Sequence, residues 1–143
     1  MTKMIKHTVT YQHNPEQVWD YLTKPELLAQ WLMPNDFQPI LGNEFQFRIK
    51  PMPAFDFDGI IYCKVLELVP FKKLSYSWKG GPEPGRITLD SVVEWTLIPT
   101  STGTDLVLEH RGFTDENLSM YSIMEPGWHK NMLEIAELLN VVK

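Results

Sequence analysis

The stretch from Pro126 to Lys143 constrains the fold more than any other part of the sequence. Its apolar residues recur at the spacing of one helix face, namely Trp128, Met132, Ile135, Ala136, Leu139 and Val142. Pro126 suits the first turn of a helix, where its missing N–H costs nothing, so we expect the helix to begin there. An amphipathic helix needs an apolar surface to cover.

Most of the remaining chain is predicted to form strands, because apolar and polar residues alternate along it or β-branched residues are frequent. The expected strands span residues 5–11, 45–49, 57–69, 74–78, 93–97 and 106–111, with Gly112 ending the last. Short connections favour antiparallel pairing. We therefore predict an α+β fold, in which a curved antiparallel sheet grips the long C-terminal helix and leaves a gap for a ligand.

Two short helices are expected between the first and second strands. Asn14 and Gln17 form a capping-box pattern, and Pro15 suits the first helical position. Pro25 restarts the chain as a second short helix through Trp31. The expected order is a strand, two short helices, about six further strands, a weaker helical stretch over residues 116–124 and the long helix.

Length, charge and cysteine content limit the class of protein. We expect one domain over residues 1–143. The net charge is −5 without a basic block, which disfavours nucleic acid and anionic membranes as partners. No apolar run approaches the ~18 residues of a membrane span, and the N-terminus lacks a secretory signal pattern. Cys63 is the only cysteine, which favours a reducing compartment, so we predict a cytoplasmic protein. The oligomeric state is not predicted.

The sequence contains no recognisable enzyme motif, such as a nucleophile elbow or a phosphate-binding loop. The four histidines lack metal-ligand spacing, so neither a metal nor a cofactor is predicted. The loop from Gly80 to Gly85 is either a plain hairpin connection or a flap over the mouth of a cavity.

Three single residues have both a structural and a functional interpretation. His110 falls on the apolar face of its strand, either as a hydrogen-bonded core imidazole or as a polar anchor or acid/base group in the cavity. Glu67 is either an outward-facing charge or a carboxylate directed into the cavity. Cys63 is expected to be a buried, inert thiol.

Large aromatic and methionine side chains fall on the faces expected to point inward. They form either a filled core or, in part, the wall of a pocket. The candidate ligand-binding residues are Trp31, Phe45, Phe47, Trp78, Trp95, Leu108, His110, Met120, Met124, Trp128 and Met132. No catalytic residue is assigned.

Four ordered stretches resemble the START-like superfamily, also called SRPBCC or helix-grip proteins. They are VWDYLTKPELLAQWLMP (18–34), VLELVPFKKLSYSW (65–78), GTDLVLEHRGF (103–113) and GWHKNMLEIAELL (127–139). The resemblance is to the branch of activators of heat-shock-protein-90 ATPase, in its bacterial stand-alone form. It implies a helix-grip fold with a cavity that takes lipids, polyketides or other apolar molecules in the wider superfamily. It also implies a break just before the long helix, consistent with the Pro-Gly at 126–127.

The leading functional hypothesis is non-enzymatic binding of a small apolar or amphipathic molecule between the sheet and the C-terminal helix. One alternative is an interaction protein that activates a chaperone ATPase. The eukaryotic protein that names the branch carries an extra N-terminal domain for chaperone binding, and this sequence starts directly at the START-like part, which weighs against that alternative. A second alternative is a cyclase or hydrolase, which would need His110 or Glu67 within hydrogen-bond reach of the substrate.

Overall fold

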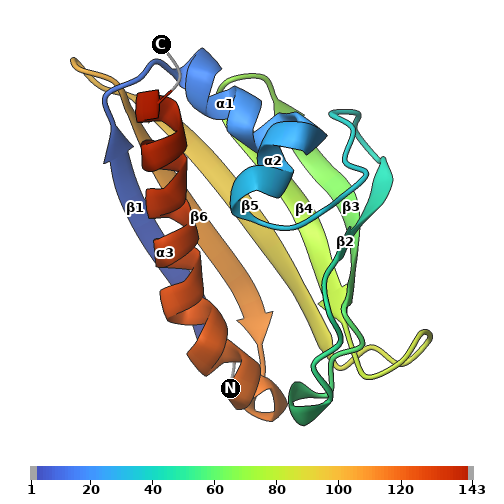
Figure 1. The fold of residues 1–143 in the computed structure, drawn as a ribbon. Helices are drawn as coiled ribbons and strands as arrows, with labels where there is room; N and C mark the ends of the chain where they lie inside the picture. The colour runs from blue at the N-terminus through green and yellow to red at the C-terminus, as the bar shows by residue number, and fades with distance from the viewer. Residues whose placement is uncertain (1–2, 142–143) are drawn as a thin grey trace.

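A computed structural model describes residues 3–141 of the chain. Within that range six strands form one antiparallel sheet in the order β1-β6-β5-β4-β3-β2 (Figure 1). The strands are β1 (Lys3–Tyr11), β2 (Glu44–Arg48), β3 (Ile60–Val69), β4 (Lys73–Gly80), β5 (Leu89–Pro99) and β6 (Thr104–Phe113). Five strands therefore follow the two short helices, not about six.

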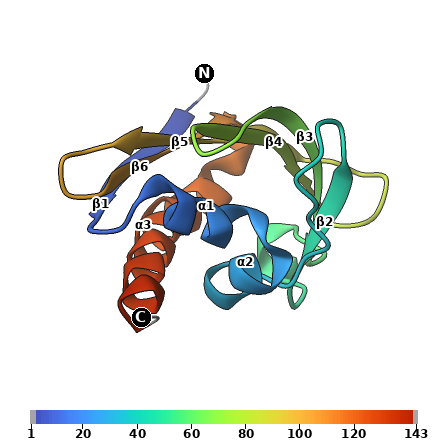
Figure 2. The same cartoon turned by 90° about the horizontal axis from the view of Figure 1, so that it is seen from above.

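The helices lie together against one face of this sheet. They are α1 (Pro15–Thr23), α2 (Pro25–Trp31) and α3 (Leu118–Val141), with short 3-10 helices η1 (Pro53–Phe55) and η2 (Asp115–Asn117). Figure 2 shows the sheet curving over α1, α2 and α3. The predicted α+β helix-grip fold is confirmed.

The start of α1 follows directly from its sequence. Asn14 accepts a hydrogen bond from the backbone N–H of Gln17 at 2.9 Å, and its own N–H donates to the Gln17 side chain at 3.1 Å. This reciprocal pair satisfies two N–H groups that the first helical turn leaves without partners. Pro15 occupies the first position of α1, and Pro25 does the same for α2.

Alternation along the strands places one set of side chains against the helices. His110 of β6 is paired with Ile5 of β1 and with Val93 of β5, and Val93 is paired with Tyr76 of β4. All four side chains are at most 1% exposed. Because successive residues point to opposite faces, this register buries one row of every strand against the helices.

The other face of the sheet is polar and carries a line of ion pairs that runs from β1 to β3. Opposite charges alternate along it through Lys6, Glu109, Arg111, Glu94, Lys73 and Glu67, at separations of 3.3 to 3.8 Å. Partly exposed pairs of this kind contribute little stability individually. Their balanced signs leave this line without a net charge.

The prediction that the long helix begins at Pro126 is wrong. The α3 helix begins at Leu118, and Pro126 lies inside it. The stretch over 116–124 and the terminal helix are thus largely one element, without the predicted break at 126–127. Pro126 has no N–H, so the Ser122 carbonyl one turn earlier lacks its helical donor. Both residues are exposed, and water can donate to this carbonyl instead. Val142 lies outside the described residues.

Most strand ends also differ from the predicted ranges, and two of the differences have a clear physical reason. The predicted strand over 57–69 begins only at Ile60, because Phe57 pairs instead with Met52 in an isolated bridge. The last strand extends through Gly112 to Phe113, since Gly112 adopts a φ of 113° that glycine accommodates without strain.

Replacement of Pro126 tests the continuity of α3. Proline in a helix interior costs about 3 kcal/mol relative to alanine, partly offset by its effect on the unfolded chain. We expect Pro126→Ala to raise the free energy of unfolding by about 1–2 kcal/mol in urea denaturation. Pro25→Ala, at the first position of α2, is the control and should bring no gain. Equal, negligible effects of the two changes would contradict a helix that continues through residue 126.

Candidate ligand-binding cavity

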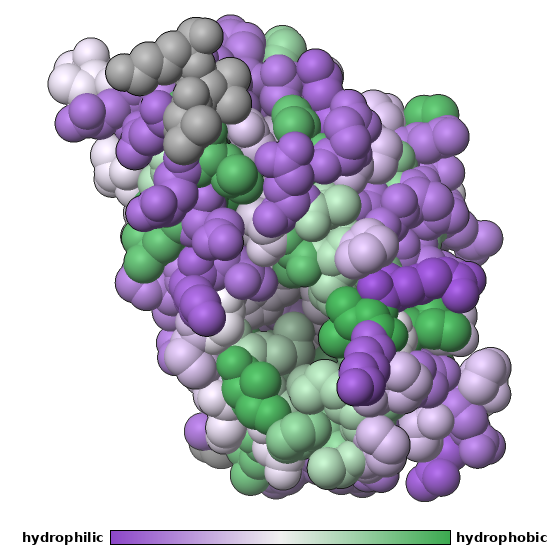
Figure 3. Space-filling view, in the orientation of Figure 1, coloured by the Kyte–Doolittle hydropathy of each residue, from purple (hydrophilic) through white to green (hydrophobic). Residues whose placement is uncertain are grey.

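A cavity of about 700 Å³ lies between the sheet and the N-terminal half of α3. Its walls come from the C-terminal end of β4, the start of β5, the segment between β2 and β3, and α3 from Ser119 to Asn131. Figure 3 shows the hollow on this face, with hydrophobic residues gathered around it. The gap expected between sheet and helix therefore exists beside the part of α3 that precedes Pro126.

Apolar side chains of adaptable shape dominate the wall. Four methionines take part, from three separate segments of the chain: Met33, Met52, Met120 and Met124. Aromatic rings come from Phe55, Phe57, Trp78 and Trp128. Methionine is unbranched and flexible, so such a wall can adapt to ligands of different outline.

Charged groups occur at the rim rather than in the depth of the cavity. Arg86, Asp56 and Glu116 line the cavity and are exposed. Asn117 also lines it, but its side chain is engaged: it donates to the Thr88 carbonyl at 2.9 Å and accepts from the Thr114 N–H at 2.9 Å. The arrangement suits a molecule with an apolar body and a more polar end near solvent.

The segment from Ile49 to Gly59 is held as a tight loop at the mouth. A Cβ at Gly59 would clash with the Ile49 carbonyl oxygen, and the glycine has a φ of 92°. The Asp58 N–H donates to the Gly81 carbonyl at 2.8 Å, which ties this loop to the β4–β5 connection. Gly80, Gly81 and Arg86 line the cavity, so this connection borders the mouth, and both interpretations of the Gly80–Gly85 loop stay open.

The predicted ligand-binding residues divide into two groups. Trp78, Met120, Met124 and Trp128 line the cavity. The other seven are at most 4% exposed and pack in the core without lining it: Trp31, Phe45, Phe47, Trp95, Leu108, His110 and Met132. Ligand binding by any of the eleven stays a prediction.

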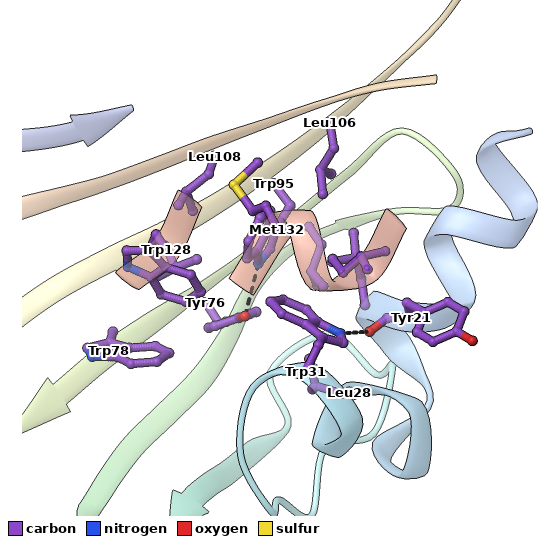
Figure 4. Packing of buried hydrophobic residues seen from close by; sticks show 14 of the residues in the cluster. Tyr21, Leu28, Trp31, Tyr76, Trp78, Trp95, Leu106, Leu108, Trp128 and Met132 are labelled. Carbon is purple, nitrogen blue, oxygen red and sulfur yellow. Dashed lines mark hydrogen bonds between the residues drawn. The ribbon is translucent and has the colours of Figure 1, made fainter. Parts of the chain in front are cut away.

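The six predicted aromatic residues form one continuous chain of ring contacts. In the order in which neighbouring rings touch, they are Phe45, Phe47, Trp78, Trp128, Trp95 and Trp31, and the centroids of successive rings are 5.3 to 5.8 Å apart. Figure 4 shows Trp31, Trp95, Trp128 and Trp78 in this arrangement. The N–H of Trp95 donates to the Tyr76 hydroxyl at 2.9 Å, and that of Trp31 donates to the Tyr21 carbonyl at 2.8 Å. This part of the gap is a filled core.

His110 joins the two tryptophans of the cavity wall. The Trp128 N–H donates to His110 Nδ1 at 3.0 Å, and His110 Nε2 lies 2.8 Å from the Ser91 hydroxyl. That hydroxyl donates to the Trp78 carbonyl at 2.7 Å, so Nε2 carries the histidine proton. Burial lowers the pKa of His110 to about 3. Its geometry matches the core-imidazole interpretation.

Glu67 and Cys63 also lie away from the cavity. Glu67 is an outward-facing charge that pairs with Lys73 at 3.4 Å. Cys63 is buried, and burial raises the pKa of its thiol well above the ordinary value, which disfavours a reactive thiolate. Neither residue lines the cavity.

Sequence reasoning missed the segment between β2 and β3 as a wall of the cavity. Ile49, Met52, Phe55 and Phe57 line it. Their prolines and irregular spacing indicated only a turn or crossing, and the residues share no single period. The sequence signal available for this wall was that two large apolar residues, Met52 and Phe57, flank a short turn.

The described part of the chain has neither a cluster of metal-binding side chains nor a helix able to cross a membrane. Within residues 3–141, no three His, Cys, Asp or Glu side chains are placed so that together they could hold a metal ion. No helix in that range is both long and apolar enough to cross a membrane.

The comparisons with known proteins bear on the family. The family model described as "Activator of Hsp90 ATPase homolog 1-like protein" matches residues 12–140. The chain belongs to this family. Its fold is that of a ligand-binding type of domain. A search of curated proteins found no match.

Solved structures agree with this family assignment. Protein MLL2253 from Mesorhizobium loti is 34% identical, with a TM-score of 0.86 and coverage of 99% of both chains. Protein BH1534 from Bacillus halodurans is 25% identical, with a TM-score of 0.71 and coverage of 92% of this chain and 94% of that one. DynU16, from the dynemicin biosynthetic locus, is 18% identical with a TM-score of 0.78. It matches 98% of this chain and 48% of its own, and shows the fold alone.

The pKa of His110 predicts a dependence of stability on pH. The pKa falls from 6.5 to about 3 on folding, so the unfolded state binds more protons between these values. The contribution of His110 to the free energy of unfolding is fully present above pH 6.5 and is lost as the pH falls toward 3. We expect a slope of up to about 1.4 kcal/mol per pH unit from His110 in this window.

The measurement is urea denaturation at several pH values, with the histidine tautomer followed by NMR. His110 should keep a neutral ring protonated at Nε2 down to about pH 4, given its low pKa. Protonation of His110 near pH 6.5 in the folded protein would contradict the network.

Proposed function

We propose that this chain binds a small apolar or amphipathic molecule in the cavity between the sheet and α3, without catalysing a reaction. The observation that carries the proposal is the cavity of about 700 Å³ with methionine and aromatic walls. Its volume falls within the roughly 300–1,000 Å³ typical of small-molecule sites. The family's ligand-binding type of fold supports the same conclusion.

An amphipathic ligand is supported by the distribution of charge. Arg86, Asp56 and Glu116 border the opening, whereas the tryptophans and methionines form the interior wall. A charged group deep in such a wall would lose its hydration without a compensating partner. The ligand therefore places its apolar body inside and its most polar end at the rim.

Binding without catalysis is favoured by the placement of the two candidate acid/base groups. Both nitrogens of His110 are engaged in the core, and Glu67 lies on the opposite face of the sheet. Neither residue lines the cavity. The predicted cytoplasmic location and single-domain organisation of residues 1–143 stay predictions.

A charge placed in the wall tests the location of the site. Met124→Glu places a carboxylate in the cavity wall. When an apolar molecule binds against it, the carboxylate loses water of hydration without a compensating partner, and this loss weakens binding. We expect a loss of roughly tenfold or more in affinity for the uncharged fluorescent probe N-phenylnaphthylamine. Native mass spectrometry of the protein with lipid and metabolite extracts identifies the ligand class.

Leu133→Glu is the matched control. Leu133 is on the same helix, is 46% exposed and does not line the cavity. The affinity of the Leu133→Glu variant for the probe should stay close to that of the unmodified protein. If the unmodified protein does not bind the probe and retains no molecule from the extracts, the proposed function is wrong.

A further inference from the structure

Trp78, which lines the cavity, carries an unusual polar group. Its Nε1 is the one buried side-chain nitrogen or oxygen that lacks a hydrogen-bond partner within residues 3–141. The residue is 2% exposed and lines the cavity. By contrast, the indole N–H groups of Trp31, Trp95 and Trp128 each donate to a named acceptor.

An unpaired buried N–H needs a physical explanation. Nearly all buried donors in native proteins have an acceptor, because losing water without a replacement is costly. A partner for Trp78 Nε1 would have to come from outside the described residues. Because Trp78 is one of the residues that line the cavity, a bound molecule is a natural source of that acceptor.

The indole of Trp78 is held in place on several sides. Its ring contacts Phe47 and Trp128, both with centroids 5.3 Å away. Its backbone carbonyl accepts from Ser91, which His110 in turn positions. A donor fixed in this way is pre-organised for an acceptor, so little ordering cost remains when a ligand binds.

We propose that Trp78 Nε1–H donates a hydrogen bond to an oxygen at the inner end of the bound molecule. The cavity would then select apolar molecules that carry a carbonyl or similar acceptor over hydrocarbons of the same shape. This inference rests on the proposed function. Nε1 is buried, so the proposal requires a small shift of neighbouring side chains. The wall contains flexible methionines, Met120 and Met124 among them, which favour such an adjustment.

The test compares two uncharged naphthalenes of the same shape. One carries an acetyl group, and the other an isopropenyl group, in which a methylene replaces the carbonyl oxygen. The unmodified protein should bind the acetyl probe roughly tenfold more tightly, as measured by titration calorimetry or displacement of N-phenylnaphthylamine. Trp78→Phe keeps an aromatic ring and the backbone carbonyl but removes the N–H, so the preference should disappear.

Trp31→Phe provides a control for removal of an indole. Trp31 does not line the cavity, its ring contacts Trp95 rather than Trp78, and its N–H is already donated to the Tyr21 carbonyl. The preference for the acetyl probe should therefore persist in Trp31→Phe. Loss of the preference in both variants would show that Trp78 has no special role and overturn the proposal.

A measurement on the unmodified protein covers the case in which Trp78→Phe does not fold. In isotope-labelled protein, the indole N–H signal of Trp78 should move to lower field on addition of the acetyl probe but not of the isopropenyl probe. Contacts with the Phe47 ring assign the signal. An unmoved signal with both probes bound would overturn the donor role.

The remaining outcomes separate the two proposals. Equal binding of both probes by the unmodified protein overturns the role of Trp78 and leaves the binding function intact. If neither naphthalene binds while N-phenylnaphthylamine does, the donor role is overturned and the binding function stands. If N-phenylnaphthylamine also fails to bind and no molecule is retained from the extracts, the proposed function is contradicted and the donor role falls with it.

Discussion

The chain of aromatic contacts from Phe45 to Trp31 is the constraint on which the structure depends. It links β2, β4, α3, β5 and α2, elements that are far apart in the sequence. Large rings bury much apolar area each, and their edge-to-face contacts fix orientation as well as distance. Trp128 is central, since it contacts both Trp78 and Trp95 and so holds α3 at a set position on the sheet.

The cavity follows from how far this chain extends. Towards its C-terminal end, α3 packs against the core through Met132, Ile135 and Leu139, which are all at most 4% exposed. Towards its N-terminal end it faces the loops after β2 and β4, which do not fill the space. Trp78 and Trp128 stand at the boundary, so the core that stabilises the fold also forms the inner wall of the site. His110 belongs to this boundary as a positioning residue, because it joins the two tryptophans through Ser91.

Local patterns explain which predictions from the sequence were confirmed. The capping box at Asn14 and Gln17 acts within four residues, and its geometry is present. The inward faces of β5 and β6 follow from period-two alternation, which places Trp95, Leu108 and His110 in the buried row. The error at Pro126 has the opposite origin. A preference for the first helical turn is weak, and packing of the residues on both sides of Pro126 holds one continuous helix in spite of it.

The sequence by itself determined the fold class and the faces of strands and helices that turn inward, because periodicity is a property of neighbouring residues. Only the tertiary structure decided which inward side chains meet and which leave space. Met120 and Phe47 have equally apolar patterns, yet one lines the cavity and the other is fully packed. That difference depends on the separation of elements brought together from distant parts of the chain. The same reason explains the partners of His110 and the unpaired N–H of Trp78, which no local pattern encodes.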